Sequence, residues 1–196
     1  VAKNLLNSGT LSFVAGTDLT FDGGVAQTFK PGASVLSSDI FVTGAGTAVT
    51  LSTNALNIGV NNLNIASSTS LDIIGQGLTA NVLSNDGTLR LIGGNTINLT
   101  TQDVNSGTYE YYGDGALALN IYNIKDFGVN DYYNLVINDL SVTNKDTFQI
   151  AAGLKVFNNF TVNSGSFNAS AQIPDVDANV TIGTAGALTA SSSATA

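Results

Sequence analysis

Few residues in this chain could do chemistry, and those that could are carboxylates. His and Cys are absent, which removes the commonest general base and metal ligand and the thiol nucleophile. Carboxylate chemistry on a polysaccharide would need acidic residues gathered with a basic one on one face. The densest such group is Asp126, Asp131 and Asp139 with Lys125. Because no spacing forces these side chains together, we expect a longer solvated loop with ordinary charges, no catalytic residue and no enzyme.

A second acidic stretch has the spacing of oxygen ligands for Ca²⁺. Asp175, Asp177 and Asn179 follow Pro174. The stretch lacks the glycine and distal Glu of a calcium loop, and the glycine-rich nonapeptide of β-roll proteins is absent too. Glycine pairs occur elsewhere, at residues 23–24 and 93–94, but without the helix start and Lys of a phosphate loop. We therefore expect solvated turns, with no metal site and no cofactor.

All six tyrosines lie in one third of the chain, at Tyr109, Tyr111, Tyr112, Tyr122, Tyr132 and Tyr133. Tyrosines can stack in a core, or they can form a face that binds carbohydrate or a protein partner. The matching positions of an earlier repeat, described below, are also aromatic or apolar. That match favours the core, and the binding face stays the alternative.

The composition is that of a sheet protein with an uncharged polar surface. Of the 196 residues, 43% are hydrophobic, and only 10% are charged, against about 25% in ordinary soluble domains. Asn, Thr, Ser and Gly replace the charged residues, and these types favour strands and turns over helices. In such a chain the four glycosylation sequons are near the number expected by chance, at Asn98, Asn159, Asn168 and Asn179.

Charge and hydropathy exclude several partners. The net charge is −8, and the six basic residues are scattered, so neither nucleic acid nor an anionic membrane surface has a basic patch to bind. No apolar run approaches the ~18 residues of a membrane span. The chain does not begin with Met and shows no signal segment. We expect a processed product, a segment of something longer or an edited sequence.

A short phrase recurs four times, at residues 7–11, 85–89, 105–109 and 163–167. Each copy has Asn, then Ser or Asp, then Gly, then Thr or Ser and an apolar residue. Asn and Gly favour a turn, and the final apolar residue is expected to point inward from a strand. The recurrence predicts a repeat fold with a turn and a strand start at each copy.

The phrases lie inside a longer repeat. Residues 19–73 and 109–169 follow the same order of aromatic, tight turn and alternating strands, and residues 56–65 align with 154–162 around an Asn pair. The second copy is longer, through residues 124–132. We expect a single solenoid domain over 1–196, with two internal modules near 19–108 and 109–190.

Within the copies the apolar residues alternate with a period of two, as in Leu56, Ile58 and Val60. No amphipathic helix separates the strands, which leaves a parallel β-helix or an antiparallel sandwich. We favour the β-helix, because stacked coils place like residues on like and explain the recurring phrase. At roughly 20 residues per coil the chain would make nine or ten coils.

Residues 131–138 and 153–167 resemble the repeats of very large bacterial surface proteins, namely adhesin and autotransporter-passenger β-helices, including the filamentous-haemagglutinin type. The resemblance covers roughly residues 18–170. It implies a right-handed parallel β-helix displayed outside the cell, and it transfers no functional residues. Members of this group usually run to many hundreds of residues, so the chain would be an excerpt or a small subunit.

Neither end shows a capping helix, and residues 187–196 are small, suited to a linker or to packing on a neighbour. We expect the coils to continue, in a longer chain or head to tail in a homopolymer. The predicted function is an extracellular structural protein: a filament, sheath or adhesin stalk. The alternatives are a sandwich subunit that polymerises by strand donation, and a β-helix that binds surface carbohydrate or degrades polysaccharide.

Overall fold

The computed structural model describes residues 1–14, 16–169 and 174–189, and within them the chain forms only strands, β1 to β19. Each strand pair with an assigned register is parallel. The fold is therefore a parallel β-solenoid of about nine turns, as predicted, and the antiparallel sandwich is wrong. None of the described residues forms a helix that is long and apolar enough to cross a bilayer.

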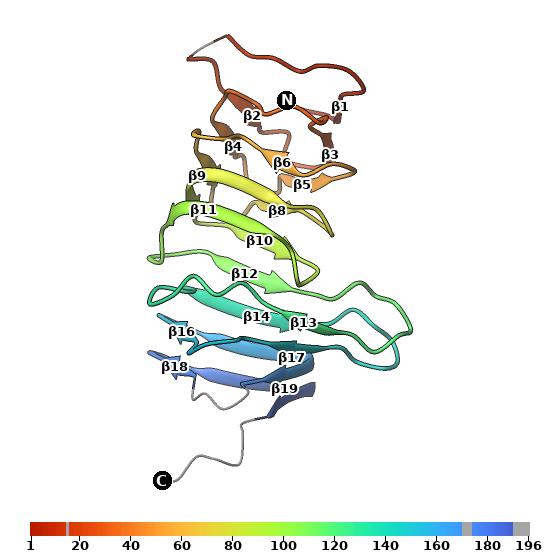
Figure 1. Cartoon of the computed structure of the whole chain (residues 1–196), viewed down its shortest axis with the longest axis vertical. Coiled ribbons are helices and arrows are strands. Elements are labelled where there is room, and N and C mark those ends of the chain that lie inside the picture. The colour runs from red at the N-terminus through yellow and green to blue at the C-terminus, as the bar shows by residue number, and fades with distance from the viewer. Residues whose placement is uncertain (15, 170–173, 190–196) are drawn as a thin grey trace. The chain divides into compact units, whose positions relative to one another are not determined.

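The chain divides into two compact units. Unit 1 contains Val1–Arg90 and Asn95–Gly107, and unit 2 contains Leu91–Gly94 and the described part of Thr108–Ala196. Figure 1 shows the strands of each unit lying one above another, as expected for successive coils. Of the small-residue stretch at 187–196, for which a linker or packing on a neighbour is predicted, residues 187–189 belong to the last strand and 190–196 lie outside the described residues.

Unit 1 has two stacks of parallel strands (Figure 1). The first contains β1 (Leu5–Leu6), β3 (Ala26–Lys30), β5 (Ala48–Leu51), β8 (Ser70–Asp72) and β10 (Thr88–Leu91). The second contains β2 (Leu19–Phe21), β4 (Ile40–Val42), β7 (Leu63–Ile65), β9 (Leu78–Asn85) and β11 (Ile97–Gln102), with β6 (Leu56–Asn57) beside β9. The eight-residue β9 thus spans the places of both β6 and β7 in the preceding coil.

Unit 2 is also built from stacks of parallel strands. Its main stack contains β12 (Thr108–Tyr111), β14 (Asn134–Asn138), β17 (Phe160–Asn168) and β19 (Val180–Thr189). The far half of β17 also pairs with β15 (Thr147–Gln149), which pairs with β13 (Ile121–Asn123). A third stack contains β16 (Lys155–Val156) and β18 (Asp175–Val176).

Coil length varies more than the predicted 20 residues. Ser70 pairs with Thr88, 18 positions along the chain, whereas Thr108 pairs with Asn134, 26 positions along. The longest coil contains the segment 124–132, where the second copy is predicted to be longer. Alternate residues of the strands point inward, so the cores are apolar and continuous within each unit.

The predicted alternation fails at one place. Leu56 and Ile58 are fully buried, but Val60 is 86% exposed. Gly59 has a φ of +59°, and the amide of Asn61 donates to the carbonyl of Ile58, so a turn interrupts the strand before Val60. Residues 56–60 therefore contain one short strand followed by a turn.

The turn phrase gives different results at its four copies. At 85–88 and 105–108 it forms turns that lead into β10 and β12, as predicted, and Leu89 and Tyr109 are buried. At 7–10 the chain bends but no strand follows. At 163–166 the turn prediction is wrong, because the phrase lies inside β17. Asn163 is skipped in the pairing with β14 and with β19, so the extra residue forms a bulge and the strand continues.

Candidate functional site

The free edge of β19 is the feature of unit 2 with the clearest capacity to bind another molecule. On one side β19 pairs with β17 through eight residue pairs, from Val180 to Thr189. Among the described residues, no strand pairs with its other side. An edge of this kind presents a row of unpaired backbone groups to any strand that can align with it.

The register of this pairing shows that the edge also exposes core positions. Val180, Ile182 and Leu188 lie opposite Phe160, Val162 and Phe167, which are fully buried. The three β19 residues are 49%, 43% and 38% exposed, in that order. They occupy inward positions of a coil that nothing in the described chain covers, and the β19 face therefore lacks one layer of packing.

The backbone at this edge faces outward in a defined register. The amide of Phe160 donates to the carbonyl of Asn179 at 2.9 Å, and the amide of Ala169 donates to that of Thr189 at 2.9 Å. Because amide directions alternate along a parallel ladder, the N–H groups of Val180 and Ile182 point away from β17. Apolar side chains and available amides thus occur at the same positions of β19.

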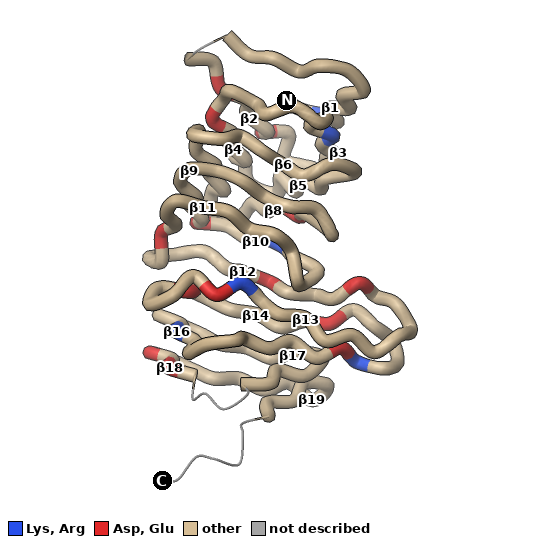
Figure 2. Tube along the Cα trace, in the orientation of Figure 1, with Lys and Arg blue, Asp and Glu red and all other residues tan. Residues whose placement is uncertain are grey.

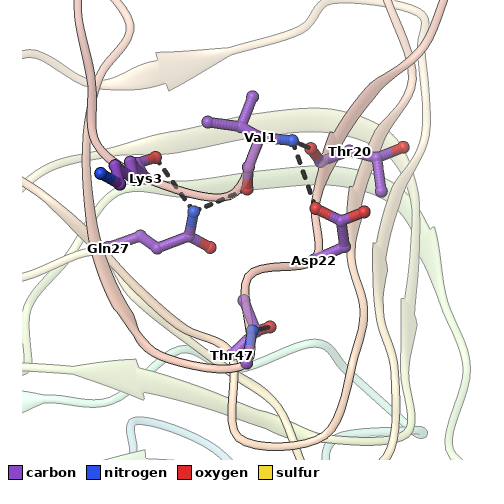
Figure 3. A network of polar contacts seen from close by, with 7 residues as sticks. Val1, Lys3, Thr20, Asp22, Gln27 and Thr47 are labelled. Carbon is purple, nitrogen blue, oxygen red and sulfur yellow. Dashed lines mark hydrogen bonds and ion pairs between the residues drawn. The ribbon is translucent and has the colours of Figure 1, made fainter.

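At the first coil of unit 1, polar contacts join residues 1–3 to the next coil (Figure 3). The side-chain amide of Gln27 donates to the carbonyls of Val1 and Lys3, at 2.6 and 3.0 Å. The amide of Asp22 donates to the carbonyl of Val1 at 3.3 Å, and the Asp22 carboxylate lies 3.4 Å from the Val1 amine. Polar contacts therefore join the first residues of this coil to the next coil, while Leu6 of the same coil is 61% exposed.

The four charged residues that the sequence suggests for carboxylate chemistry do not lie in one cluster. Asp131 is fully buried, and its carboxylate accepts the amides of Phe127 at 2.7 Å and Lys155 at 2.9 Å. Burial raises the pKa of Asp131 above its ordinary value, and the nearby negative charge of Asp126 adds to the rise, while the amide donors oppose it. Lys125 lies over the ring of Phe127, 5.7 Å from its centre. The expected solvated loop is thus wrong for Asp131, which ties two segments together.

Asp139 belongs to a separate group. It is buried, and its carboxylate accepts the amides of Ser141 at 3.0 Å and Asp146 at 2.7 Å. Asp146 is fully buried as well, and its carboxylate accepts the amide of Asn120 at 2.8 Å. Sequence reasoning missed Asp146, because nothing in its neighbourhood along the chain distinguishes it from a surface aspartate. The burial of Asp146 results from contacts with neighbouring coils, which exist only in the folded structure.

The acidic stretch at 174–179 binds a lysine of the preceding coil. Lys155 Nζ lies 3.1 Å from Asp175 and 2.5 Å from Asp177, and these contacts, with Asp177 first, raise its pKa. Asp175 begins β18, so a strand stands where a turn is predicted. The carboxylates remain exposed, as expected. Across the described ranges, no three acidic residues are grouped so that they could hold a metal ion.

Four of the six tyrosines are buried in the core of unit 2, as expected: Tyr109, Tyr111, Tyr112 and Tyr132. The hydroxyls of Tyr111 and Tyr132 are 3.0 Å apart, and the amide of Lys125 donates to Tyr111 at 3.1 Å. Burial raises the pKa of Tyr111 to about 12. Tyr122 and Tyr133 are half-buried, and Tyr122 stacks on Phe148. The buried rings cannot form the alternative carbohydrate-binding face.

Two sequon asparagines take part in a ladder that crosses the coils of unit 2. The side chain of Asn134 accepts the backbone amide of Asn159 at 3.3 Å, and Asn179 donates to the Asn159 side chain at 3.0 Å. The other two sequon residues are Asn98, which is exposed, and Asn168, which is half-buried. These asparagines form hydrogen bonds between successive coils, and such stacking is what the recurrent Asn pair predicts.

A groove of about 650 Å³ lies on unit 2 beside the loop that contains Gly128 and Val129. Its polar lining includes Asp126 and Lys155. Asp126 accepts the amide of Gly128 at 2.7 Å, and Lys155 is paired with two aspartates. Since these groups already hold partners within the chain, the groove offers a ligand mainly apolar contact.

The chain matches no family model, no curated protein and no solved structure.

Proposed function

We propose that this chain is a structural element of an extracellular fibre, such as a surface filament, sheath or adhesin stalk, which is extended by adding a coil to the free edge of β19. The observation that carries the proposal is the exposure of Val180, Ile182 and Leu188 at inward positions of β19, a strand that pairs with β17 on one side only within the described residues. A further parallel coil would cover these side chains and pair with the amides beside them.

A second copy of the chain can supply that coil. Within the described residues β1 pairs only with β3, so the other edge of β1 is available, and Leu6, the second residue of β1, is 61% exposed. Joining β19 of one copy to β1 of the next repeats one contact without limit, which is the head-to-tail geometry of a filament. Further coils of a longer chain would satisfy the same edge.

The chemistry of the chain also supports a structural role. The buried carboxylates of Asp131, Asp139 and Asp146 accept backbone amides within unit 2, which stabilises its loops. The resemblance of residues 131–138 and 153–167 to bacterial surface β-helices points in the same direction and supports an extracellular location.

The test is to block the edge with one charge. Edge lysines prevent strand addition in natural sheets, so Ile182→Lys is expected to abolish end-to-end association of the full chain. Val60→Lys is the matched control, because Val60 is 86% exposed on a turn of unit 1. Sedimentation velocity over a range of concentrations and electron microscopy would measure the assembly.

We expect linear oligomers for the unmodified chain and the Val60→Lys control, and monomers for Ile182→Lys. Circular dichroism of the monomers would confirm that the lysine leaves the fold intact. Monomers of the unmodified chain at every concentration would refute self-assembly, and oligomers of Ile182→Lys that match the control would show that β19 is not the contact.

A further inference from the structure

Two buried aspartates close the loop between β14 and β15. Asp139 follows β14 and is 2% exposed, and Asp146 precedes β15 and is fully buried. The residues between them include Val142, which is 88% exposed. The loop therefore extends into solvent while both of its ends are held by carboxyl groups in the interior of unit 2.

Three of the four carboxyl oxygens of this pair have backbone donors. Asp139 Oδ1 accepts the amide of Ser141 at 3.0 Å, and Asp139 Oδ2 accepts the amide of Asp146 at 2.7 Å. Asp146 Oδ1 accepts the amide of Asn120 at 2.8 Å. The fourth oxygen, Asp146 Oδ2, is buried and has no hydrogen-bond partner. Leaving one oxygen of an ionised carboxylate in this state is strongly unfavourable.

The unpartnered oxygen lies beside the same glycine as one oxygen of Asp139. A Cβ atom placed on Gly113 would lie 2.6 Å from Asp146 Oδ2 and 2.8 Å from Asp139 Oδ1. Both oxygens thus border the same small space beside the Gly113 backbone. Two carboxylates that border one buried space repel each other when both are ionised, and one proton on Asp146 removes the repulsion.

We propose that Asp146 holds one proton beside Asp139 and that the two residues form an acid latch, which keeps the loop at 139–146 closed when the proton is bound. The proton resides on Asp146 Oδ2, because both oxygens of Asp139 are occupied by amide donors, and it gives the unpartnered oxygen a hydrogen to donate to Asp139 Oδ1. Loss of the proton leaves two negative charges in a buried space and loosens the loop.

The other charged and titratable groups around the pair are Asp114, Lys145 and Tyr122. Burial raises the pKa of Asp146, the charges of Asp139 and Asp114 add to the rise, and the Asn120 amide and the Lys145 charge oppose it. Lys145 Nζ donates to the carbonyl oxygens of Asp139 and Ser141, so it holds the loop backbone. Burial, with the negative charges of Asp114 and Asp146, raises the pKa of Tyr122 to about 12, so Tyr122 stays neutral.

The direction of the pH effect follows from the raised pKa of Asp146. The folded loop binds the proton more tightly than the unfolded chain, where an aspartate has a pKa of 3.8. The bound proton on Asp146 therefore stabilises the closed loop, and this stabilisation is lost progressively as the pH rises from 3.8 through the pKa of Asp146 in the folded chain. The loop is expected to be most ordered in mild acid and more open at neutral or alkaline pH.

Two amide substitutions distinguish the latch from a simple structural contact. Asp146→Asn imitates the protonated acid, because its Oδ1 still accepts the Asn120 amide and its NH₂ group can donate to Asp139. It should slow amide hydrogen exchange of residues 140–145 at neutral pH and remove the pH dependence of that exchange. Asp139→Asn replaces an acceptor of two amides by a donor, and should speed exchange by about tenfold or more.

Carboxyl ¹³C NMR of the unmodified chain provides a test that needs no variant to fold. The latch predicts an Asp146 titration above the ordinary aspartate range, and a titration at about 3.8 would overturn it. Protection of the loop at neutral pH by CaCl₂ in the unmodified chain, absent in Asp146→Asn, would overturn it too, because a cation would then fill the space assigned to the proton.

Discussion

The two units build the same kind of coil from different side chains. The core of unit 1 is mainly aliphatic, with Phe21 and Phe29 in contact at one place. In unit 2 the largest fully buried side chains are aromatic: Tyr111, Tyr132, Phe148, Phe160 and Phe167. Bulkier residues fill more space, which is consistent with the 26 positions between paired residues of β12 and β14 in unit 2, against 18 between those of β8 and β10 in unit 1.

The units also satisfy their loop amides differently. In unit 1, tight turns such as the one at 44–47 are closed by a backbone bond, which the amide of Thr47 donates to the carbonyl of Gly44 at 2.9 Å. Unit 2 has long loops that carry acidic residues, visible in Figure 2, and three of these acids are buried: Asp131, Asp139 and Asp146. A coil can therefore be longer when its loop contains a carboxylate that accepts hydrogen bonds from the backbone amides that the loop buries.

The largest expected loss of stability comes from a substitution that disturbs the close contact between stacked coils of unit 1. Gly107 has a φ of +72°, and a Cβ atom there would lie 1.8 Å from the carbonyl oxygen of Asn85 in the preceding coil. Gly115 in unit 2 has a φ of +69° but no atom within 4 Å of the corresponding position. Gly107→Ala is expected to cost about 3–5 kcal/mol in the free energy of unfolding, and Gly115→Ala about 1 kcal/mol. Urea unfolding measures both.

Because the two glycines share a backbone conformation, the difference between the variants isolates the collision with the neighbouring coil. Equal losses of stability would mean that the positive φ alone determines the cost, and that the coils of unit 1 can separate to admit a methyl group.

A smaller effect compares the ladders of the two units. Asp39 accepts the backbone amide of Asn62 at 2.7 Å in unit 1, and Asn134 accepts that of Asn159 at 3.3 Å in unit 2. The charged acceptor makes the shorter bond, so Asp39→Ala should cost about 2 kcal/mol and Asn134→Ala about 1 kcal/mol. Thermal and urea unfolding would measure the stability of both variants. A larger loss of unfolding free energy for Asn134→Ala than for Asp39→Ala would contradict this expectation.

The sequence predicts the ladder and the fold well, because both follow from local repetition. The Asn pair, the period of two and the turn phrase indicate stacked parallel strands. It does not predict that residues 163–166 continue a strand, since the bulge at Asn163 depends on the coils stacked on both sides. The role of Asp146 is hidden for the same reason: its burial comes from the loops of neighbouring coils. Contacts along the chain are readable from sequence, and contacts between coils of unequal length are not.

The smallest effects concern ion pairs. In unit 1, Arg90 lies 3.0 Å from Asp72, whose side chain is 11% exposed, while in unit 2 Lys155 binds Asp175 and Asp177, which are 71% and 49% exposed. Removing the partner of the more buried carboxylate matters more, so Arg90→Ala should cost about 1 kcal/mol. Lys155→Ala should leave the unfolding midpoint unchanged, because water screens the exposed pairs. Unfolding in 0.05 M and 1 M NaCl would separate the two, since added salt should weaken the Lys155 pairs first; a larger loss of stability for Lys155→Ala would show that unit 2 depends on these surface contacts.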